Sequence, residues 1–492
     1  MSPERPDAVI APSAERLRYP VVVVGSGPGG SVAASLLSNA GRDVLILEEG
    51  PYLTQSSCKP YSSEEMERKY RNGGVGLAFG RPKVTYVEAR CAGGGSEVNA
   101  GLYYRARPEV LEAWRRDFRV AEFDPGELDS HYESIEKQLN VLDDAREPTG
   151  AGDRLRLGAE KLGLSTLNSR CSFHQGPGDA GGDSESQRAS MTRNYLPSAF
   201  RRGARLLADC RVNSFRRYGD RWVLRCVHAP AGAEPRSIEV EAETLFLCCG
   251  AIQTPALLQR SGIRRNVGRS LAMQATAKVT ARFDEEVNCP TMGVPTQAVD
   301  AFAPRFFFTC ASSSPGYLAL EMMQFPNDFP KLEECWPQMA IYSARISGGV
   351  GRVDALPGFS DPLVRFKLTD GDIRDLSDAI RELCRLLFAA GARELYPSLL
   401  LGEPLRSQDD LDRIPIPLDR AITNLMTLHI SSSCPMGEDT NRCAIDSFGR
   451  VHGVEALHVA DASILCTAPG ANPQGTIMAI VERNLLHYLA GR

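Results

Sequence analysis

The chain has 492 residues, of which 43% are hydrophobic and 24% charged, with a net charge of −5 and a pI of about 5.9. This length allows two or three domains, or two large interleaved ones, with a core that needs neither disulfides nor metals. The charge excludes a global basic field for nucleic acid or an anionic membrane, and no apolar run is long enough to span a bilayer.

The first 20 residues are polar and lack the apolar core and cleavage site of a signal peptide, so we expect a cytoplasmic protein. The sequence has 14 cysteines but no Cys-x-x-Cys pair and no metal-ligand spacing. Because free cysteine behaves as a small hydrophobe, we expect these thiols to be reduced and mostly buried, with no metal site.

The chain begins with a strand, a glycine turn, a helix and a second strand. Val21–Val24 is a β-branched run typical of a buried parallel strand, 25–30 is rich in glycine, 31–39 reads as a helix, and 43–47 reads as a strand. This order predicts one right-handed β–α–β unit.

The turn fits the pattern G-x-G-x-x-G, with Gly25, Ser26, Gly27, Gly29 and Gly30 in the loop. Glycines allow a tight turn and close approach to a pyrophosphate, and the helix N-terminus attracts the phosphate charge. Glu48 ends the second strand, where an acidic residue can bind ribose hydroxyls. This context disfavours a glycine turn without a ligand, but by itself it leaves NAD and FAD both open.

Farther along, three consecutive glycines within 90–105 suit close backbone contact with a ligand. The next predicted elements are a helical stretch over 108–141, a long loop over 171–190, and strands over 210–243 and 245–249. The remaining ones are an antiparallel sheet over 275–370, a helix over 371–392, and a final helix from Thr476.

Four separated segments carry a family resemblance: VVVVGSGPGGSVAASLLSNAGRDVLILEEG, RCAGGGSEVNAGLYYR, TLFLCCGAIQTPALLQRSGI, and a tail with HISSSCPMG and GRVHGVEALHVADASILCTAPGANPQGTIMAIVERN. In order and spacing they resemble the glucose–methanol–choline (GMC) oxidoreductases, which are FAD-dependent. The tail is most similar to those of cholesterol oxidases and long-chain alcohol oxidases. The anchors span residues 21 to 484, nearly the whole chain.

The resemblance implies roles for individual residues. Gly25, Gly27 and Gly30 would hold the FAD pyrophosphate and Glu48 the adenosine ribose. The resemblance also places other residues along the cofactor, namely Gly94, Gly95 and Asn99 beside the flavin, Val212 at the adenine, Gly250 and Asp461 near the cofactor chain, and Thr476 near the flavin ring. The second segment holds no histidine that would tether FAD, so we expect non-covalent binding.

His429 and Asn472 match the family's catalytic pair. A histidine can accept the proton of a substrate hydroxyl near neutral pH, and an asparagine amide can donate to the developing alkoxide. A buried structural histidine and a helix-capping asparagine are the ordinary alternatives for the two positions. Departures from the family pattern, such as Ser432-Ser433 in the histidine motif, indicate a specialised branch.

The resemblance therefore predicts oxidation of a CH–OH group by hydride transfer to flavin, with O2 or another acceptor reoxidising it. The aromatic segments 306–308 and 317–325 suggest a lipophilic substrate or a secondary-metabolite intermediate, although core strands are the alternative explanation. A flavin-dependent desaturase or cyclisation catalyst, a lyase with redox-idle FAD, and a redox-dead FAD protein acting through a partner remain open.

The predicted fold class is α/β, with a discontinuous Rossmann-like FAD-binding domain and a substrate domain built on an antiparallel sheet. We expect residues 1–105, 200–270 and 425–492 to form the FAD-binding domain. Residues 106–199 and 271–424 would form the substrate-binding cap, with the substrate pocket between the two. The sequence is silent on oligomeric state.

Overall fold

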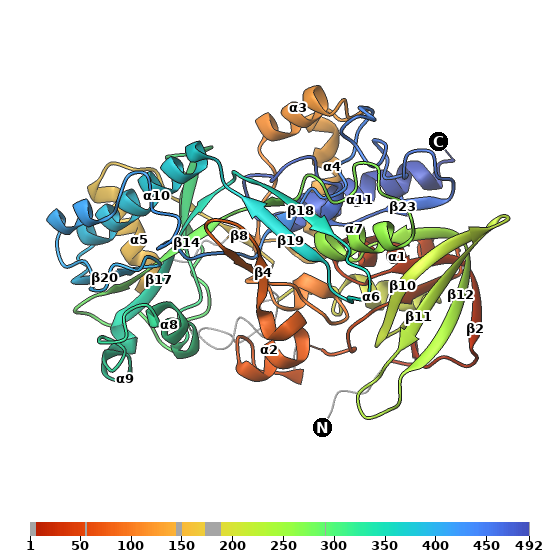
Figure 1. Cartoon of the computed structure of the whole chain (residues 1–492), viewed down its shortest axis with the longest axis horizontal. Helices are drawn as coiled ribbons and strands as arrows, with labels where there is room; N and C mark the ends of the chain where they lie inside the picture. Colours follow the sequence, from red (N-terminus) through yellow and green to blue (C-terminus); the bar gives the residue numbers. More distant parts are fainter. Residues whose placement is uncertain (1–5, 55–56, 144–149, 173–187, 291, 492) are drawn as a thin grey trace.

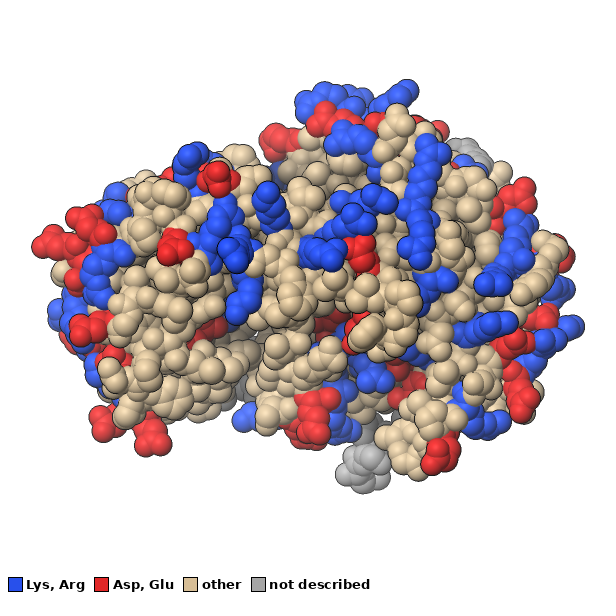
Figure 2. Space-filling view, viewed as in Figure 1, with Lys and Arg blue, Asp and Glu red and all other residues tan. Residues whose placement is uncertain are grey.

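The computed structural model describes residues 6–54, 57–143, 150–172, 188–290 and 292–491. Two large sheets lie toward opposite ends of an elongated molecule, with β2 and β10–β12 at one end and β14, β17 and β20 at the other (Figure 1). Lys and Arg are interspersed with Asp and Glu over the face drawn in Figure 2. The mixed α/β architecture confirms the predicted fold class.

The first sheet has the strand order β1-β9-β3-β2-β12-β11-β10, and β23 also pairs with β12. Its parallel strands are β1 (Val9–Ile10), β9 (Arg205–Leu207), β3 (Val44–Leu47), β2 (Arg16–Val24), β12 (Arg236–Leu247) and β23 (Leu457–Val459), and its antiparallel strands are β11 (Arg221–His228) and β10 (Cys210–Tyr218). Val21–Val24 are at most 4% exposed, because helices cover the parallel part of this sheet.

Helix α1 (Pro28–Asn39) packs against α11 (Gln474–Leu489), and α11 also packs against α4 (Pro125–Leu139). The final helix therefore begins two residues before the predicted Thr476. The stretch expected to be helical over 108–141 contains two helices, α3 (Pro108–Asp117) and α4, with a break between them. In the segment between the two helices, Arg119 and Glu122 each have a positive φ, which a right-handed helix does not allow. Asp124 then caps the N-terminus of α4 through a capping box.

The second sheet has the order β4-β5-β21-β14-β17-β16-β15-β7, with β20 paired to β14. Its strands are β4 (Gly76–Ala78), β5 (Val84–Tyr86), β21 (Leu425–Thr427), β14 (Thr276–Arg282), β17 (Met339–Ile346), β16 (Phe306–Cys310), β15 (Gln297–Val299), β7 (Leu167–Asn168) and β20 (Glu394–Pro397). All pairs in this sheet that involve these strands are antiparallel except β21–β5, as predicted for 275–370.

Helices α5 (Gly150–Lys161) and α10 (Asp370–Ala389) cover one face of this second sheet (Figure 1). The apolar residues expected over 371–392 lie in α10, and Ile373, Leu376 and Ile380 are at most 2% exposed. The domain limits stay a prediction. Strands β4, β5 and β21, which we assigned to the FAD part, pair in this second sheet.

Most of the fourteen cysteines are buried, as predicted. The described residues contain no cluster of His, Cys, Asp or Glu suited to a metal ion. Among these residues no helix combines the length and apolar character needed to cross a bilayer. Most of the loop expected over 171–190 lies outside the described residues, since 173–187 are not included.

Candidate active site

The glycine loop joins the end of β2 to the start of α1, as the fingerprint predicts. Gly25 has φ +101°, and a Cβ there would lie 2.2 Å from the Cys248 carbonyl oxygen. A Cβ on Gly29 or Gly30 would likewise lie about 2 Å from a backbone oxygen. At Gly27, by contrast, the nearest atom to an added Cβ would be 3.9 Å away. Three glycines therefore serve backbone packing, whereas Gly27 borders open space.

The N-terminus of α1 is suited to an anion. Gly27 is its N-cap, no side chain caps the helix, and its first turn carries no acidic residue. The free N–H groups and the positive end of the helix dipole therefore face no competing carboxylate from the helix itself. A cofactor pyrophosphate fits this arrangement.

Glu48 lies under the glycine loop. One carboxylate oxygen accepts hydrogen bonds from the Ser26 N–H (3.0 Å) and hydroxyl (2.6 Å), and the other accepts from the Gly50 N–H (2.8 Å). Burial raises the pKa of Glu48, and these hydrogen bonds oppose that shift. A carboxylate offers about four acceptor positions, so one remains for a ribose hydroxyl. Val212 lies on β10, whose first residue, Cys210, donates its N–H to the Glu48 carbonyl.

The second glycine run meets the first loop. A Cβ on Gly94 would lie 2.8 Å from the Cα of Gly27, and a Cβ on Gly95 would meet no atom within 4 Å. Asn99 accepts from the Gly101 N–H (2.9 Å), which identifies its side-chain oxygen, and its amide nitrogen donates to Gln474 Oε1 (2.6 Å). Asn99 is thereby tied to the first residue of α11.

Asp461 joins two segments far apart in the chain. Its carboxylate accepts from the Gly250 N–H (2.9 Å), the Thr254 hydroxyl and the Ser463 N–H (2.8 Å). Burial raises its pKa, and these donors oppose the shift. A Cβ on Gly250, where φ is +86°, would meet no atom within 4 Å. Gly27, Gly95 and Gly250 therefore each border space in which a cofactor could lie against the backbone.

Thr476 occupies the first turn of α11 but is fully buried. Its hydroxyl accepts from the Ala106 N–H (3.0 Å) and the Tyr132 hydroxyl (2.9 Å). The side chain is therefore engaged by the protein, and any contact with a flavin would come from the backbone of this turn.

His429 lies between β21 and β22 (Ile430–Ser431), and its Nδ1 is 2.7 Å from Gln274 Oε1. The Gln274 amide nitrogen donates to the Ala471 carbonyl (3.0 Å), which can only accept, so the amide orientation is fixed. Oε1 then faces His429, whose Nδ1 must carry a proton to donate to it. In the neutral imidazole Nε2 consequently has the free lone pair. Burial, and secondarily the charge of Arg345, hold the pKa of His429 well below its usual range.

Asn472 follows Ala471 directly, so the backbone brings the predicted pair together through Gln274. Arg345 Nη1 donates to Asn472 Oδ1 (2.9 Å). Because a guanidinium can only donate, the Asn472 atom that faces Arg345 must be the amide oxygen. The amide nitrogen therefore points elsewhere, and it has no acceptor among the described residues. Asn472 does not cap α11, whose N-cap is Pro473 without a side-chain hydrogen bond.

Sequence reasoning missed Gln274 and Arg345. Gln274 ends the segment from Val267 in which the chain departs from the family pattern, and that departure was its only signal in the sequence. Arg345 lies in a segment without a motif, and only the pairing of β14 with β17 reveals its place. The aromatic run at 306–308 is divided between two faces. Phe306 and Phe308 pack in the core beneath α10, and Phe307 lies 5.0 Å from the Arg345 guanidinium and edge-on to Tyr104.

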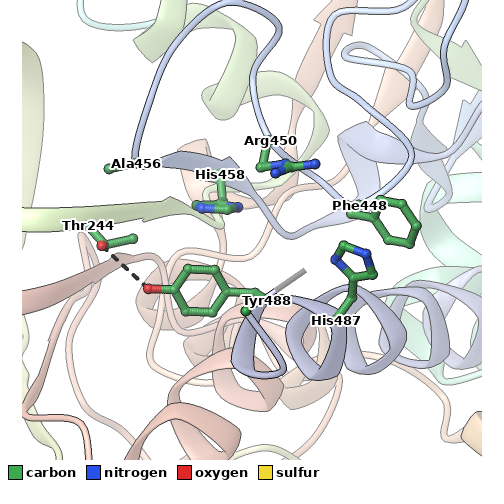
Figure 3. Close-up of a pocket in the computed structure, with 8 residues that line it drawn as sticks. Thr244, Phe448, Arg450, Ala456, His458, His487 and Tyr488 are labelled. Atoms are coloured by element: carbon green, nitrogen blue, oxygen red, sulfur yellow. Dashed lines mark hydrogen bonds between the residues drawn. The ribbon is translucent and has the colours of Figure 1, made fainter.

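A pocket of about 280 Å³ lies elsewhere, and Figure 3 shows the residues that line it: Thr244, Phe448, Arg450, Ala456, His458, His487, Tyr488 and Gly491. Thr244 lies within β12, three residues before its end, and Ala456 comes just before β23. The carboxyl ends of these two strands instead lead to Gly250 and Asp461. Ligands of open α/β sheets bind outside the carboxyl ends of strands, so this pocket is not the nucleotide site. His458 stacks on Phe246, and burial lowers its pKa to about 4.

Comparison with known proteins identifies the family. GMC oxidoreductase models match residues 66–276 and 351–480, and an NAD(P)-binding Rossmann-like domain model matches 23–62. An uncharacterised GMC-type oxidoreductase of Sinorhizobium fredii, y4nJ, is 38% identical over 95% of this chain and 94% of its own length.

The Arabidopsis thaliana long-chain-alcohol oxidase FAO3 is 27% identical over 94% of this chain and 67% of its own length. The crystal structure of pyridoxine 4-oxidase from Mesorbium loti superposes with a TM-score of 0.71 at 18% identity, covering 95% of this chain and 98% of that one. The chain therefore belongs to the GMC oxidoreductase family, and it is an oxidoreductase with FAD as its cofactor.

Proposed function

We propose that this enzyme oxidises a hydroxyl group of a small-molecule substrate by hydride transfer to FAD, with O2 or another acceptor taking the electrons. The observation that carries the proposal is the chain of contacts from His429 through Gln274 to Ala471 and Asn472. It leaves one basic nitrogen and one amide donor for a substrate hydroxyl. The name of the Arabidopsis relative, an alcohol oxidase, supports the same reaction class.

The residues that would hold the cofactor are those around the glycines that border open space and the buried carboxylates of Glu48 and Asp461. Gly25, Ser26, Gly27, Gly29 and Gly30 would surround the pyrophosphate, Glu48 would bind the ribose, and Val212 would lie at the adenine. Gly94, Gly95, Asn99, Gly250, Asp461 and Thr476 would border the ribityl chain and the flavin. Bound FAD supplies the hydride acceptor.

In this proposal His429 Nε2 takes the proton of the substrate hydroxyl while hydride leaves the carbon. The Asn472 amide nitrogen donates to the same oxygen as its negative charge develops. Gln274 is a positioning residue that keeps the proton of His429 on Nδ1. Arg345 is a positioning residue for Asn472, because its Nη1 fixes which end of the amide faces the substrate.

The direct test is an absorbance spectrum of the purified protein, followed by anaerobic addition of primary, secondary and sterol-like alcohols. Bleaching of the flavin bands by an alcohol, with a product carbonyl that a hydrazine traps, is the expected result. A flavin that no hydroxy compound bleaches, whether a neutral alcohol or a hydroxy acid, would contradict the proposal.

The rate of flavin reduction should stay constant as pH falls from about 8 past about 6.5, the usual pKa of histidine. Burial of His429 and the nearby charge of Arg345 both disfavour the imidazolium, so the basic form persists into acid. Anaerobic stopped-flow measurements across this range would check it, with flavin absorbance at each pH confirming that FAD stays bound. A rate that halves at or above pH 6.5 would show that His429 is not a base with a lowered pKa.

A further inference from the structure

Arg345 lies on the central strand β17, on the face of the second sheet turned away from α5 and α10. Its neighbours across the sheet are Thr276 on β14 and Phe307 on β16. The alternate residues of β17, Tyr342 and Ala344, point into the core under α10 and are fully buried. The strand therefore projects the guanidinium toward Asn472 and the candidate catalytic pair.

No carboxylate among the described residues pairs with this guanidinium. Nη1 donates to Asn472 Oδ1, Nε is covered and has no acceptor, and Nη2 makes no hydrogen bond within the described part of the chain. Other arginines with low exposure differ. Arg483 also lacks a carboxylate, but all three of its guanidinium nitrogens donate to backbone carbonyls, and two further arginines form ion pairs. Arg71 contacts Glu49, Glu88 and Asp361, and Arg282 contacts Glu394.

Burial lowers the pKa of Arg345 to about 10, so the side chain is still a cation at neutral pH. The side chain is partly exposed, but its Nε is covered and the guanidinium is partly withdrawn from water. A charge withdrawn from water without an ionic partner is destabilising, and proteins keep such groups mainly where another charge joins them. The aromatic ring of Phe307, 5.0 Å away, offsets part of this cost but satisfies no N–H group. The arrangement indicates that a ligand supplies the missing negative charge.

We propose that Arg345 binds a carboxylate of the substrate, so that the alcohol oxidised here is a hydroxy acid. The inference rests on the proposed function, because the site it completes is the one that holds the reacting hydroxyl. The guanidinium is in direct contact with Asn472, so the carboxylate lies within a few bonds of that hydroxyl. Short hydroxy acids meet this requirement, whereas a long alkyl alcohol brings no anion to Arg345.

Acetate binding to the oxidised holoenzyme tests the site without turnover. We expect acetate to perturb the flavin spectrum saturably, and Arg345→Gln to weaken that binding by about 10²-fold, the scale of a charged hydrogen bond. Acetamide, which has nearly the same shape but no charge, should bind weakly to both proteins. Failure of acetate to saturate the wild-type enzyme at millimolar concentrations would overturn the proposal.

Matched substrates give a second readout. Glycolate, 3-hydroxypropionate and 4-hydroxybutyrate would each be compared with their primary amides by anaerobic flavin reduction. We expect kcat/KM to favour at least one acid over its amide, and Arg345→Gln to remove that preference. Glutamine can still donate to Asn472 Oδ1, and any remaining disturbance of Asn472 affects acid and amide alike and cancels in the ratio. An acid-to-amide ratio that Arg345→Gln leaves unchanged would overturn the proposal.

Arg305→Gln is the matched control, since it removes the same charge from a half-exposed arginine that is paired with Asp375 and Asp378. It should leave acetate binding unchanged. The two proposals fail separately. Acetate binding without reduction of the flavin by any hydroxy compound would contradict only the proposed reaction, and bleaching by neutral alcohols without acetate binding would contradict only the role of Arg345.

Discussion

His429→Ala should lower the rate of anaerobic flavin reduction by about 10²-fold or more, the usual contribution of a general base, while FAD stays bound. The FAD contacts that we assign come from the glycine loops and buried carboxylates, none of which touches the imidazole. Stopped-flow reduction with a substrate that bleaches the wild-type enzyme measures the rate, and the ratio of flavin to protein absorbance measures occupancy. Unchanged reduction would remove His429 from the mechanism.

Gln274→Leu tests the orientation and tautomer of the His429 imidazole while the imidazole itself is kept. The variant keeps His429 but removes the acceptor that holds its proton on Nδ1. We expect a smaller loss than in His429→Ala, with retained FAD. Equal losses in the two variants would mean that the position of the imidazole matters more than its basicity.

Gly27→Val should lose FAD while the fold is preserved. Gly27 has φ −63° and ψ −174°, which a side chain can adopt, and its Cβ would meet no protein atom closer than 3.9 Å. The valine methyl groups would instead fill the space beside the N-terminus of α1. Overpacking typically costs about 1–3 kcal/mol, which corresponds to roughly a 5- to 150-fold weaker cofactor affinity.

Flavin content and circular dichroism of purified Gly27→Val would measure these two effects. Gly316→Val is the matched control, because a Cβ at Gly316 also meets no atom within 4 Å, yet the residue lies in α8 (Pro315–Met322), outside the candidate site. Normal FAD content in Gly27→Val would show that the cofactor does not approach this loop.

The local parts of the site were accessible from sequence. The strand, glycine loop and helix over residues 21–39 lie where the sequence predicts them, because each is determined by residues within its own segment, such as the β-branched run before Gly25. Glu48 was found for the same reason, since its distance from the loop is set by one β–α–β unit. The predicted helix over 371–392 also had a clear apolar period, and α10 occupies it.

The remaining parts depend on contacts between distant segments. Arg345 and Asn472 are 127 residues apart, and Gln274 and His429 are 155 residues apart, so neither pair leaves a signal in local sequence. The register of β14 against β17 and the path of the chain before α11 decide which side chains meet. Phe306 and Phe308 were ambiguous because strand alternation alone does not say which face of a sheet is core.

The glycine cradle has a thermodynamic consequence for the whole chain. Its open positions, Gly27, Gly95 and Gly250, come from segments more than 60 residues apart and adjoin only in the native fold. An unfolded chain therefore cannot reproduce the site, and cofactor binding and folding are linked equilibria. At a free FAD concentration 100 times its Kd, the native state gains about 2.7 kcal/mol. Melting temperature should thus rise with added FAD, and the cofactor-free protein should be the form most open to proteolysis.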